Sequence, residues 1–142
     1  MKVLVLNCGS SSIKYKLFEM TTKEVLAQGG IEKIGLPGSF LKLTLPSGEK
    51  KIIEKDVPEH TTGVQFIFDT LTNAEYGAVK DLHEIKAVGH RVLHGGTKFS
   101  GSVLIDDAVI AAVEECCDLG PLHNPANLKG IYAVQKLMPE VP

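Results

Sequence analysis

The hydrophobic and polar positions of the first 55 residues follow the short period of β-strands. An apolar run, Val3 to Leu6, ends at a turn rich in glycine and serine, and Ile13 to Phe18 then alternates apolar with basic residues. Two such segments on either side of a short polar turn predict a β-hairpin. Three further strands are predicted at residues 25–34, 41–45 and 51–54. We therefore expect a strand-rich beginning.

Beyond this region the apolar residues take helical spacing. One face of a helix that begins near Thr61 or Thr62 carries four of them: Val64, Ile67, Phe68 and Leu71. A strand is then predicted at residues 87–93, where an apolar run is closed by two glycines. Strands that come first and then alternate with helices indicate an α/β domain with a mixed sheet flanked by helices.

Two more helices are predicted in the last third of the chain. Asp106 is a suitable N-cap for the first, whose inward positions are Val109, Val113 and Cys116. Asn124 caps the second and Pro125 occupies its first turn. The inward positions of this second helix are Leu128, Ile131 and either Met138 or Gln135, and Pro139 ends it.

Composition and charge narrow the possible functions. The 142 residues suffice for one domain, and a net charge of −2 does not favour binding to nucleic acid or to a membrane surface. The three cysteines are odd in number and two are adjacent, which favours a reducing compartment over a disulfide framework. The apolar run before Cys8 is too short for a signal peptide, and no window reaches the length of about 18 apolar residues that spans a membrane. We expect a cytoplasmic protein that binds neither nucleic acid nor membrane.

The turn between the first two predicted strands is the first candidate site. Gly9 permits a tight turn, while the amides and hydroxyls of Ser10, Ser11 and Ser12 can donate hydrogen bonds to an anion and Lys14 adds a positive charge. This is not the Walker A pattern, which leads into a helix. The residues leave two interpretations open, a phosphate-binding turn and an ordinary polar hairpin turn.

The second candidate is an arginine between two histidines in an apolar segment. His90 and His94 would lie roughly 13 Å apart along a strand, too far for both to bind one zinc ion. The planar guanidinium of Arg91 matches a carboxylate or a phosphate. An internal salt bridge is the alternative. A third candidate, His123, precedes a predicted helix N-terminus, where either an anion or a purely local hydrogen bond would suit it.

Three segments together resemble the acetate kinase family. Residues 3–14, 89–96 and 121–125 are similar to three segments of that family, in the same order and at similar separations. The resemblance implies the fold of actin-like ATPases and sugar kinases, also called ribonuclease H-like. It further implies reversible, ATP- and Mg²⁺-dependent transfer of a phosphoryl group to acetate, which gives acetyl phosphate and ADP.

Carried over by position, the resemblance also implies roles on the nucleotide side of the site. Asn7 would help to hold Mg²⁺, Ser10 and Ser12 would line the phosphate turn, and Lys14 would contact ATP.

On the substrate side, Arg91 would bind the carboxylate and act in catalysis together with His123, which would contact the transferring phosphoryl group. Leu93 and Leu122 would line the pocket for the methyl group.

The same resemblance implies that residues 1–142 are the amino-terminal domain and that the carboxy-terminal nucleotide-binding domain is absent from this chain. We therefore expect this chain alone to be inactive and the full-length protein to be a homodimer. Two alternatives stay open: a propionate kinase of the same family, and a half-domain that binds phosphate, or pairs with another chain, without catalysis.

Overall fold

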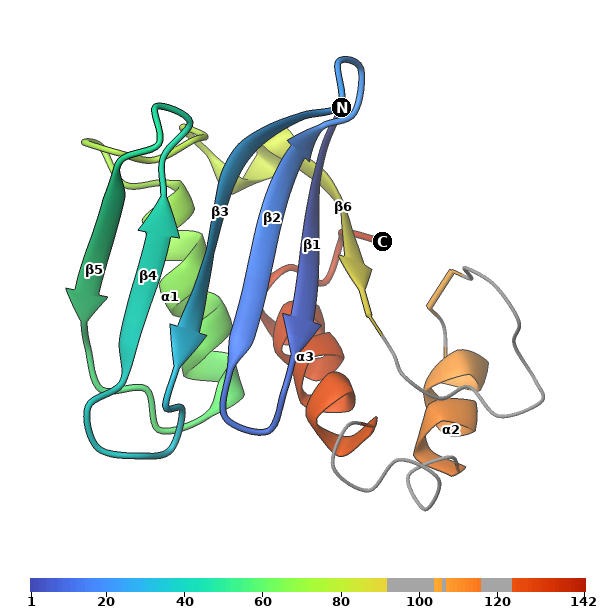
Figure 1. Ribbon diagram of the computed structural model, residues 1–142. Helices are drawn as coiled ribbons and strands as arrows, with labels where there is room; N and C mark the ends of the chain where they lie inside the picture. The colour runs from blue at the N-terminus through green and yellow to red at the C-terminus, as the bar shows by residue number, and fades with distance from the viewer. Residues whose placement is uncertain (92–103, 106, 116–123) are drawn as a thin grey trace.

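One six-stranded sheet organises the computed structural model, which describes residues 1–91, 104–105, 107–115 and 124–142 (Figure 1). The strands are β1 (Lys2–Cys8), β2 (Ile13–Glu19), β3 (Glu24–Glu32), β4 (Phe40–Thr44), β5 (Lys50–Glu54) and β6 (Ile85–His90). The helices are α1 (His60–Leu71), the 3₁₀ helix η1 (Leu82–Glu84), α2 (Asp107–Glu115) and α3 (Asn124–Leu137).

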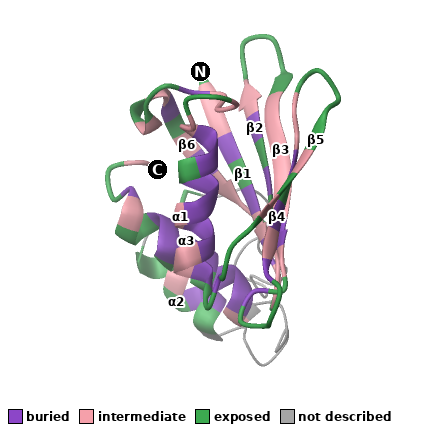
Figure 2. Cartoon of the chain, turned by 90° about the vertical axis from the view of Figure 1, so that its left-hand side faces the viewer, coloured by how far each residue is buried: buried purple, intermediate pink, exposed green. Residues whose placement is uncertain are grey.

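The strand order β5-β4-β3-β2-β1-β6 combines two kinds of pairing. The first five strands form an antiparallel meander, whereas β6 pairs in parallel with β1 after the chain has crossed over through α1. Figure 2 shows α1 and α3 together on one face of the sheet. The expected α/β architecture, a mixed sheet flanked by helices, is confirmed.

The core lies between the sheet and this pair of helices. Alternate residues of β1 and β2 are buried there: Leu4, Leu6, Cys8, Ile13, Tyr15 and Leu17. The helix α1 contributes the four apolar residues predicted from their spacing. It lies close to β2 at Gly63, where a Cβ atom would come within 2.9 Å of Ile13 Cδ1. Removal of each leucine or isoleucine side chain from water contributes about 2 kcal/mol.

The helix α1 begins at His60, so the predicted start at Thr61 or Thr62 is wrong by one or two residues. Glu59 is the N-cap, and its carboxylate accepts a hydrogen bond from the backbone N–H of Thr62 at 2.9 Å. Glutamate is not among the preferred N-cap residues. For that reason the sequence did not indicate this boundary.

Two predicted strands end earlier than expected. The strand predicted at residues 25–34 ends at Glu32, because Lys33 adopts a positive φ of 60° that leaves the extended conformation. The strand predicted at residues 87–93 ends at His90, and its last two residues lie outside the described part. Arg91 therefore follows the strand and is exposed, so it is not the arginine within an apolar strand that we expected.

The last two helices agree with their predicted inward faces. Val109 and Val113 of α2 are buried, whereas Asp106 and Cys116 lie outside the described residues. In α3, which begins at Asn124 rather than one residue later, Met138 and not Gln135 completes the buried face with Leu128 and Ile131.

No helix in the described ranges has both the length and the apolar character needed to cross a membrane.

Candidate anion-binding site

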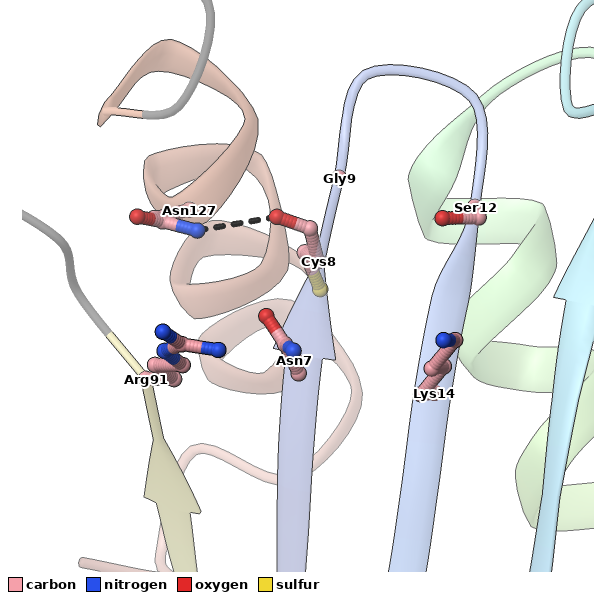
Figure 3. Close-up of a pocket in the computed structure, with 7 residues that line it drawn as sticks. All are labelled: Asn7, Cys8, Gly9, Ser12, Lys14, Arg91 and Asn127. Carbon is pink, nitrogen blue, oxygen red and sulfur yellow. Dashed lines mark hydrogen bonds between the residues drawn. The ribbon is translucent and has the colours of Figure 1, made fainter. Parts of the chain in front are cut away.

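A cavity of about 270 Å³ opens where β1, β2 and β6 end. Figure 3 shows seven described residues that line it: Asn7, Cys8, Gly9, Ser12, Lys14, Arg91 and Asn127. Two of these seven side chains are cationic, and none of these described residues carries a carboxylate. A concave site with two cations and several polar donors attracts anions.

The pairing of the strands places the charged side chains of the cavity next to one another. Asn7 of β1 lies directly opposite Lys14 of β2, and both point away from the buried side chains that face α1 and α3. The backbone N–H of Arg91 donates to the Leu6 carbonyl at 3.1 Å, which aligns Arg91 with the next residue of β1. Arg91 and Lys14 therefore lie on either side of Asn7 (Figure 3).

The backbone of the turn is tightly hydrogen-bonded. The Gly9 N–H donates to the Ser12 carbonyl at 2.8 Å, and the Ile34 N–H donates to the Ser11 carbonyl at 2.9 Å. Gly9 does not have a positive φ, but a Cβ atom there would lie 3.1 Å from Ser12 Oγ. Glycine therefore suits this position because the Ser12 hydroxyl lies so close, rather than because of its backbone angle.

The three serines of the turn differ in their placement. Ser12 lines the cavity, whereas Ser10 is exposed and is not among the lining residues. Ser11 is half-buried beside Ile34, whose N–H its carbonyl accepts. Of these three residues, Ser12 alone contributes to the cavity wall.

The structure describes some of the expected site residues and not others. It brings together Asn7, Ser12, Lys14 and Arg91, which are separated by as many as 84 positions in the sequence. Leu93, Leu122 and His123 lie outside the described residues, so their expected roles remain predictions.

Arg91, the chain's only arginine, forms no ion pair with any residue that the structure describes. The internal salt bridge, which was the alternative interpretation of this residue, is therefore not found within the described ranges. Its side chain is left to face the cavity.

Two titratable groups beside the site are uncharged at neutral pH. Burial raises the pKa of the Cys8 thiol to about 12 and lowers the pKa of the His90 imidazole to about 4. His90 lies near Gly130 of α3, on the buried side of β6. Among the described residues no three histidine, cysteine or carboxylate side chains gather as a metal site. Among the lining residues that the structure describes, the positive charge therefore comes from Lys14 and Arg91.

Two polar residues that hold the turn were not predicted from the sequence. Asn127 of α3 donates from Nδ2 to the Cys8 carbonyl at 2.8 Å, and His60 of α1 contacts the Gly9 carbonyl through Nε2 at 2.6 Å. Asn127 lies within an apolar helical pattern and His60 directly before the predicted start of one, and at both places the sequence does not distinguish a buried polar residue from an exposed one. Because both residues are far from the turn along the chain, local sequence patterns do not predict the contact.

The fold and the site together define the class of protein. A mixed sheet whose first two antiparallel strands enclose a polar turn, with a parallel crossover strand beside them, is the α/β architecture of the actin-like ATPases. The Acetokinase family model matches residues 2–142. This chain therefore belongs to the acetokinase family, and the expected resemblance is confirmed.

Individual relatives agree with this assignment. The chain is 71% identical over 142 residues to the acetate kinase of Phocaeicola vulgatus and 70% identical to that of Bacteroides thetaiotaomicron. In both comparisons the whole chain spans only 36% of the relative's length.

Solved structures show the same relationship. The crystal structure of Porphyromonas gingivalis acetate kinase superimposes with a TM-score of 0.97 at 65% identity, over 99% of this chain and 35% of that one. A propionate kinase from Francisella tularensis superimposes with a TM-score of 0.88 at 35% identity, over 99% of this chain and 35% of that one. The fold is therefore shared with kinases named for two different carboxylates.

Proposed function

We propose that this chain contributes the amino-terminal part of the site of an acetate kinase. The reaction is the reversible transfer of the γ-phosphoryl group of ATP to acetate, with acetyl phosphate and ADP as products. The observation that carries the proposal is the convergence of Lys14 and Arg91 on one cavity, on either side of Asn7. Two relatives named acetate kinase, at 71% and 70% identity, support the choice of substrate.

The main difficulty of this reaction is charge repulsion between its reactants. Acetate has a pKa of about 4 and is already an anion at neutral pH. It needs no general base, but it must approach the polyanionic end of ATP. Phosphoryl transfer is promoted mainly by alignment and by neutralisation of charge on the phosphoryl oxygens. Two cations on one small cavity meet this requirement.

We assign separate partners to the two cations. Arg91 binds the acetate carboxylate through its planar fork, which holds the attacking oxygen in line with the phosphoryl group. Lys14 neutralises the phosphates of ATP, while hydrogen bonds to them come from the Ser12 hydroxyl in the cavity wall and from the Ser10 hydroxyl at the exposed end of the turn. The two cations lie on either side of Asn7, so each anion would have a cation of its own.

Asn7 is the residue of the cavity that suits Mg²⁺. This ion prefers oxygen ligands, retains several waters and is usually held through few protein groups together with substrate phosphates. The amide oxygen of Asn7, beside lining residues that include no carboxylate in the described ranges, fits that mode, in which most of the ligands come from ATP and water. When bound, Mg²⁺ supplies charge neutralisation at the phosphates.

The remaining roles fall on residues outside the described ranges. We propose that His123 contacts the transferring phosphoryl group and that Leu93 and Leu122 line the pocket for the methyl group. The likeness to a propionate kinase at a TM-score of 0.88 makes phosphorylation of propionate the second candidate. The ratio of kcat/KM for acetate to that for propionate decides between the two substrates.

The first experiment uses a polypeptide of the relatives' full length that contains this chain. Acetyl phosphate formed from ATP, Mg²⁺ and acetate is trapped with hydroxylamine and measured as the hydroxamate. Lys14→Gln is expected to raise the KM for ATP about tenfold or more, because it removes a charge-assisted contact. The matched control is Lys16→Gln, an exposed lysine of the same strand that does not line the cavity.

Absence of acetyl phosphate from the unmodified polypeptide would overturn the proposal, and so would equal effects of the two lysine substitutions. The 142-residue chain alone is expected to bind ATP weakly without turnover, which isothermal titration and the same assay measure. Turnover by this chain alone would show that the site needs no further residues.

A further inference from the structure

Two consecutive carbonyl groups of the turn are held by side chains from two different helices. The Cys8 carbonyl accepts a hydrogen bond from Asn127 of α3 at 2.8 Å, and the Gly9 carbonyl lies 2.6 Å from Nε2 of His60 in α1. A carbonyl oxygen can only accept, so Nε2 of His60 carries the hydrogen and donates it. Both side chains are buried, at 5% and 4% exposure.

Two other carbonyl groups of the turn accept hydrogen bonds from backbone N–H groups. The Ser11 carbonyl accepts from the Ile34 N–H, and the Ser12 carbonyl accepts from the Gly9 N–H. Within residues 8–12, four carbonyl oxygens are therefore occupied by described groups, and only that of Ser10 is not. Carbonyl oxygens repel the oxygens of a phosphate. A turn whose carbonyls are engaged elsewhere presents mainly donors to an anion.

The direction of each carbonyl group also determines the direction of the N–H group in the same peptide unit. In a planar trans peptide the N–H points opposite to the carbonyl. Because Asn127 holds the Cys8 carbonyl toward α3, the next N–H, that of Gly9, is directed to the Ser12 carbonyl and closes the turn. Because His60 holds the Gly9 carbonyl toward α1, the Ser10 N–H is directed away from α1. No hydrogen bond among the described residues uses that Ser10 N–H.

We infer that His60 and Asn127 are positioning residues for phosphate binding. They fix two successive peptide groups of the turn, so that the Ser10 amide is oriented as a donor for an anion before the anion arrives. Burial of the polar side chains of a histidine and an asparagine against a sheet costs free energy, and burial of apolar side chains in the same places would not carry this cost. A donor matched to each carbonyl offsets that cost. The identity of the anion as a phosphate of ATP rests on the proposed function.

His60 is the better residue to test, because it is not among the lining residues of the cavity. His60→Gln keeps a donor nitrogen at nearly the same reach, whereas His60→Met keeps most of the volume and loses the donor. If His60→Met does not fold, His60→Asn replaces it, since its shorter amide cannot reach the Gly9 carbonyl. In the full-length polypeptide we expect His60→Met to raise the KM for ATP about tenfold, with the KM for acetate little changed. His60→Gln is expected to remain within about threefold of the unmodified protein.

The matched control is Thr70→Val in the same helix. The Thr70 hydroxyl is buried and donates to the Phe66 carbonyl at 2.8 Å, so its loss removes a bond of the same kind without contact to the turn. Thr70→Val should lower the melting temperature without a change in the KM for ATP. Equal impairment in His60→Gln and His60→Met would overturn the inference, because it would indicate packing alone. An unchanged KM in His60→Met would also overturn it.

A second measurement does not depend on catalysis. In protein labelled with ¹⁵N-serine, the Ser10 amide resonance should shift on addition of ATP in the unmodified protein and in His60→Gln. In His60→Met the shift should be much smaller at the same ATP concentration. If the unmodified protein forms no acetyl phosphate but shows this pattern, the proposed function fails and the positioning role stands. The same Ser10 shift in all three proteins would overturn the positioning role, whatever the activity.

Discussion

Asn7 and Lys14 face each other across the β1–β2 pair, on the side of the sheet opposite to the buried residues that α1 and α3 cover. The antiparallel register fixes this pair, because Cys8 and Ile13 next to them pair inside the core. A slip of one residue would move Lys14 into the apolar interior. The core therefore determines where the amide and the ammonium group lie, and the parallel strand β6 brings Arg91 beside them.

Replacement of Arg91 by alanine is expected to reduce turnover by several powers of ten without unfolding the protein. Under the proposed role, turnover falls because acetate loses the only guanidinium of this chain as the partner of its carboxylate, and alignment together with charge neutralisation supplies most of the rate in phosphoryl transfer. Stability is retained because the exposed side chain makes no ion pair with described residues, and the N–H that bonds to the Leu6 carbonyl remains. The measurements are kcat in the full-length polypeptide and the free energy of unfolding in urea.

Arg91→Lys is the informative companion of this variant. It keeps the charge but loses the bidentate fork. We expect it to recover only part of the activity, mainly in KM for acetate. Near-normal kcat in Arg91→Ala would contradict the role assigned to this residue.

Replacement of Gly130 by alanine is expected to destabilise the protein by about 1–3 kcal/mol, as overpacking does. A Cβ atom at this position of α3 would lie 2.4 Å from Cys8 Sγ, in the layer that joins the helix to the end of β1. The sign of the change in the free energy of unfolding is informative, because a glycine-to-alanine substitution in a helix interior otherwise stabilises the protein by about 1 kcal/mol. Unfolding in urea measures the effect.

Two further variants test that explanation. Gly89→Ala is the control, because the nearest atom to its Cβ would be Val5 Cγ2 at 3.7 Å, an ordinary contact. The second variant is the double substitution Gly130→Ala with Cys8→Ala, in which the sulfur that causes the clash is absent. The double variant should be less destabilised than the sum of its two single substitutions. Additive effects would indicate that the sulfur is not the obstacle.

The sequence predicted the elements of the fold well where their structure depends on residues that are close along the chain. The alternation in Ile13 to Phe18 predicted a half-exposed strand, and the structure has β2 there with the predicted apolar residues buried. The turn between β1 and β2 was located for the same reason. The prediction was less accurate at ends that depend on a single contact or dihedral angle, such as the Glu59 cap and the positive φ of Lys33.

The site required long-range information that local patterns do not contain. The charge of Arg91 and its planar shape were evident from the sequence, but its position beside Asn7 depends on the parallel pairing of β6 with β1. His60 and Asn127 were missed, because a donor for a distant carbonyl leaves no periodic signal. Both contacts can be identified only once the helices are packed on the sheet.

The stability of the protein should fall between pH 7 and pH 5 because of His90. Burial lowers the pKa of this imidazole from 6.5 to about 4 in the folded state. The unfolded state therefore binds the proton more tightly, so the contribution of His90 to stability is complete above pH 6.5 and is lost as the pH falls toward 4. A pKa shift of this size corresponds to a loss of about 2 kcal/mol by pH 5.

The pH range in which His90 lowers stability is separate from the range in which the carboxylates do so. The pKa of Glu84 is lowered to about 2, chiefly by its hydrogen bond from Lys2, so its contribution disappears only as the pH falls below the ordinary value of 4.5. Urea unfolding at pH 7 and pH 5 should show the loss in the unmodified protein and a much smaller one in His90→Gln. The same pH dependence in His90→Gln as in the unmodified protein would show that His90 is not the group that titrates.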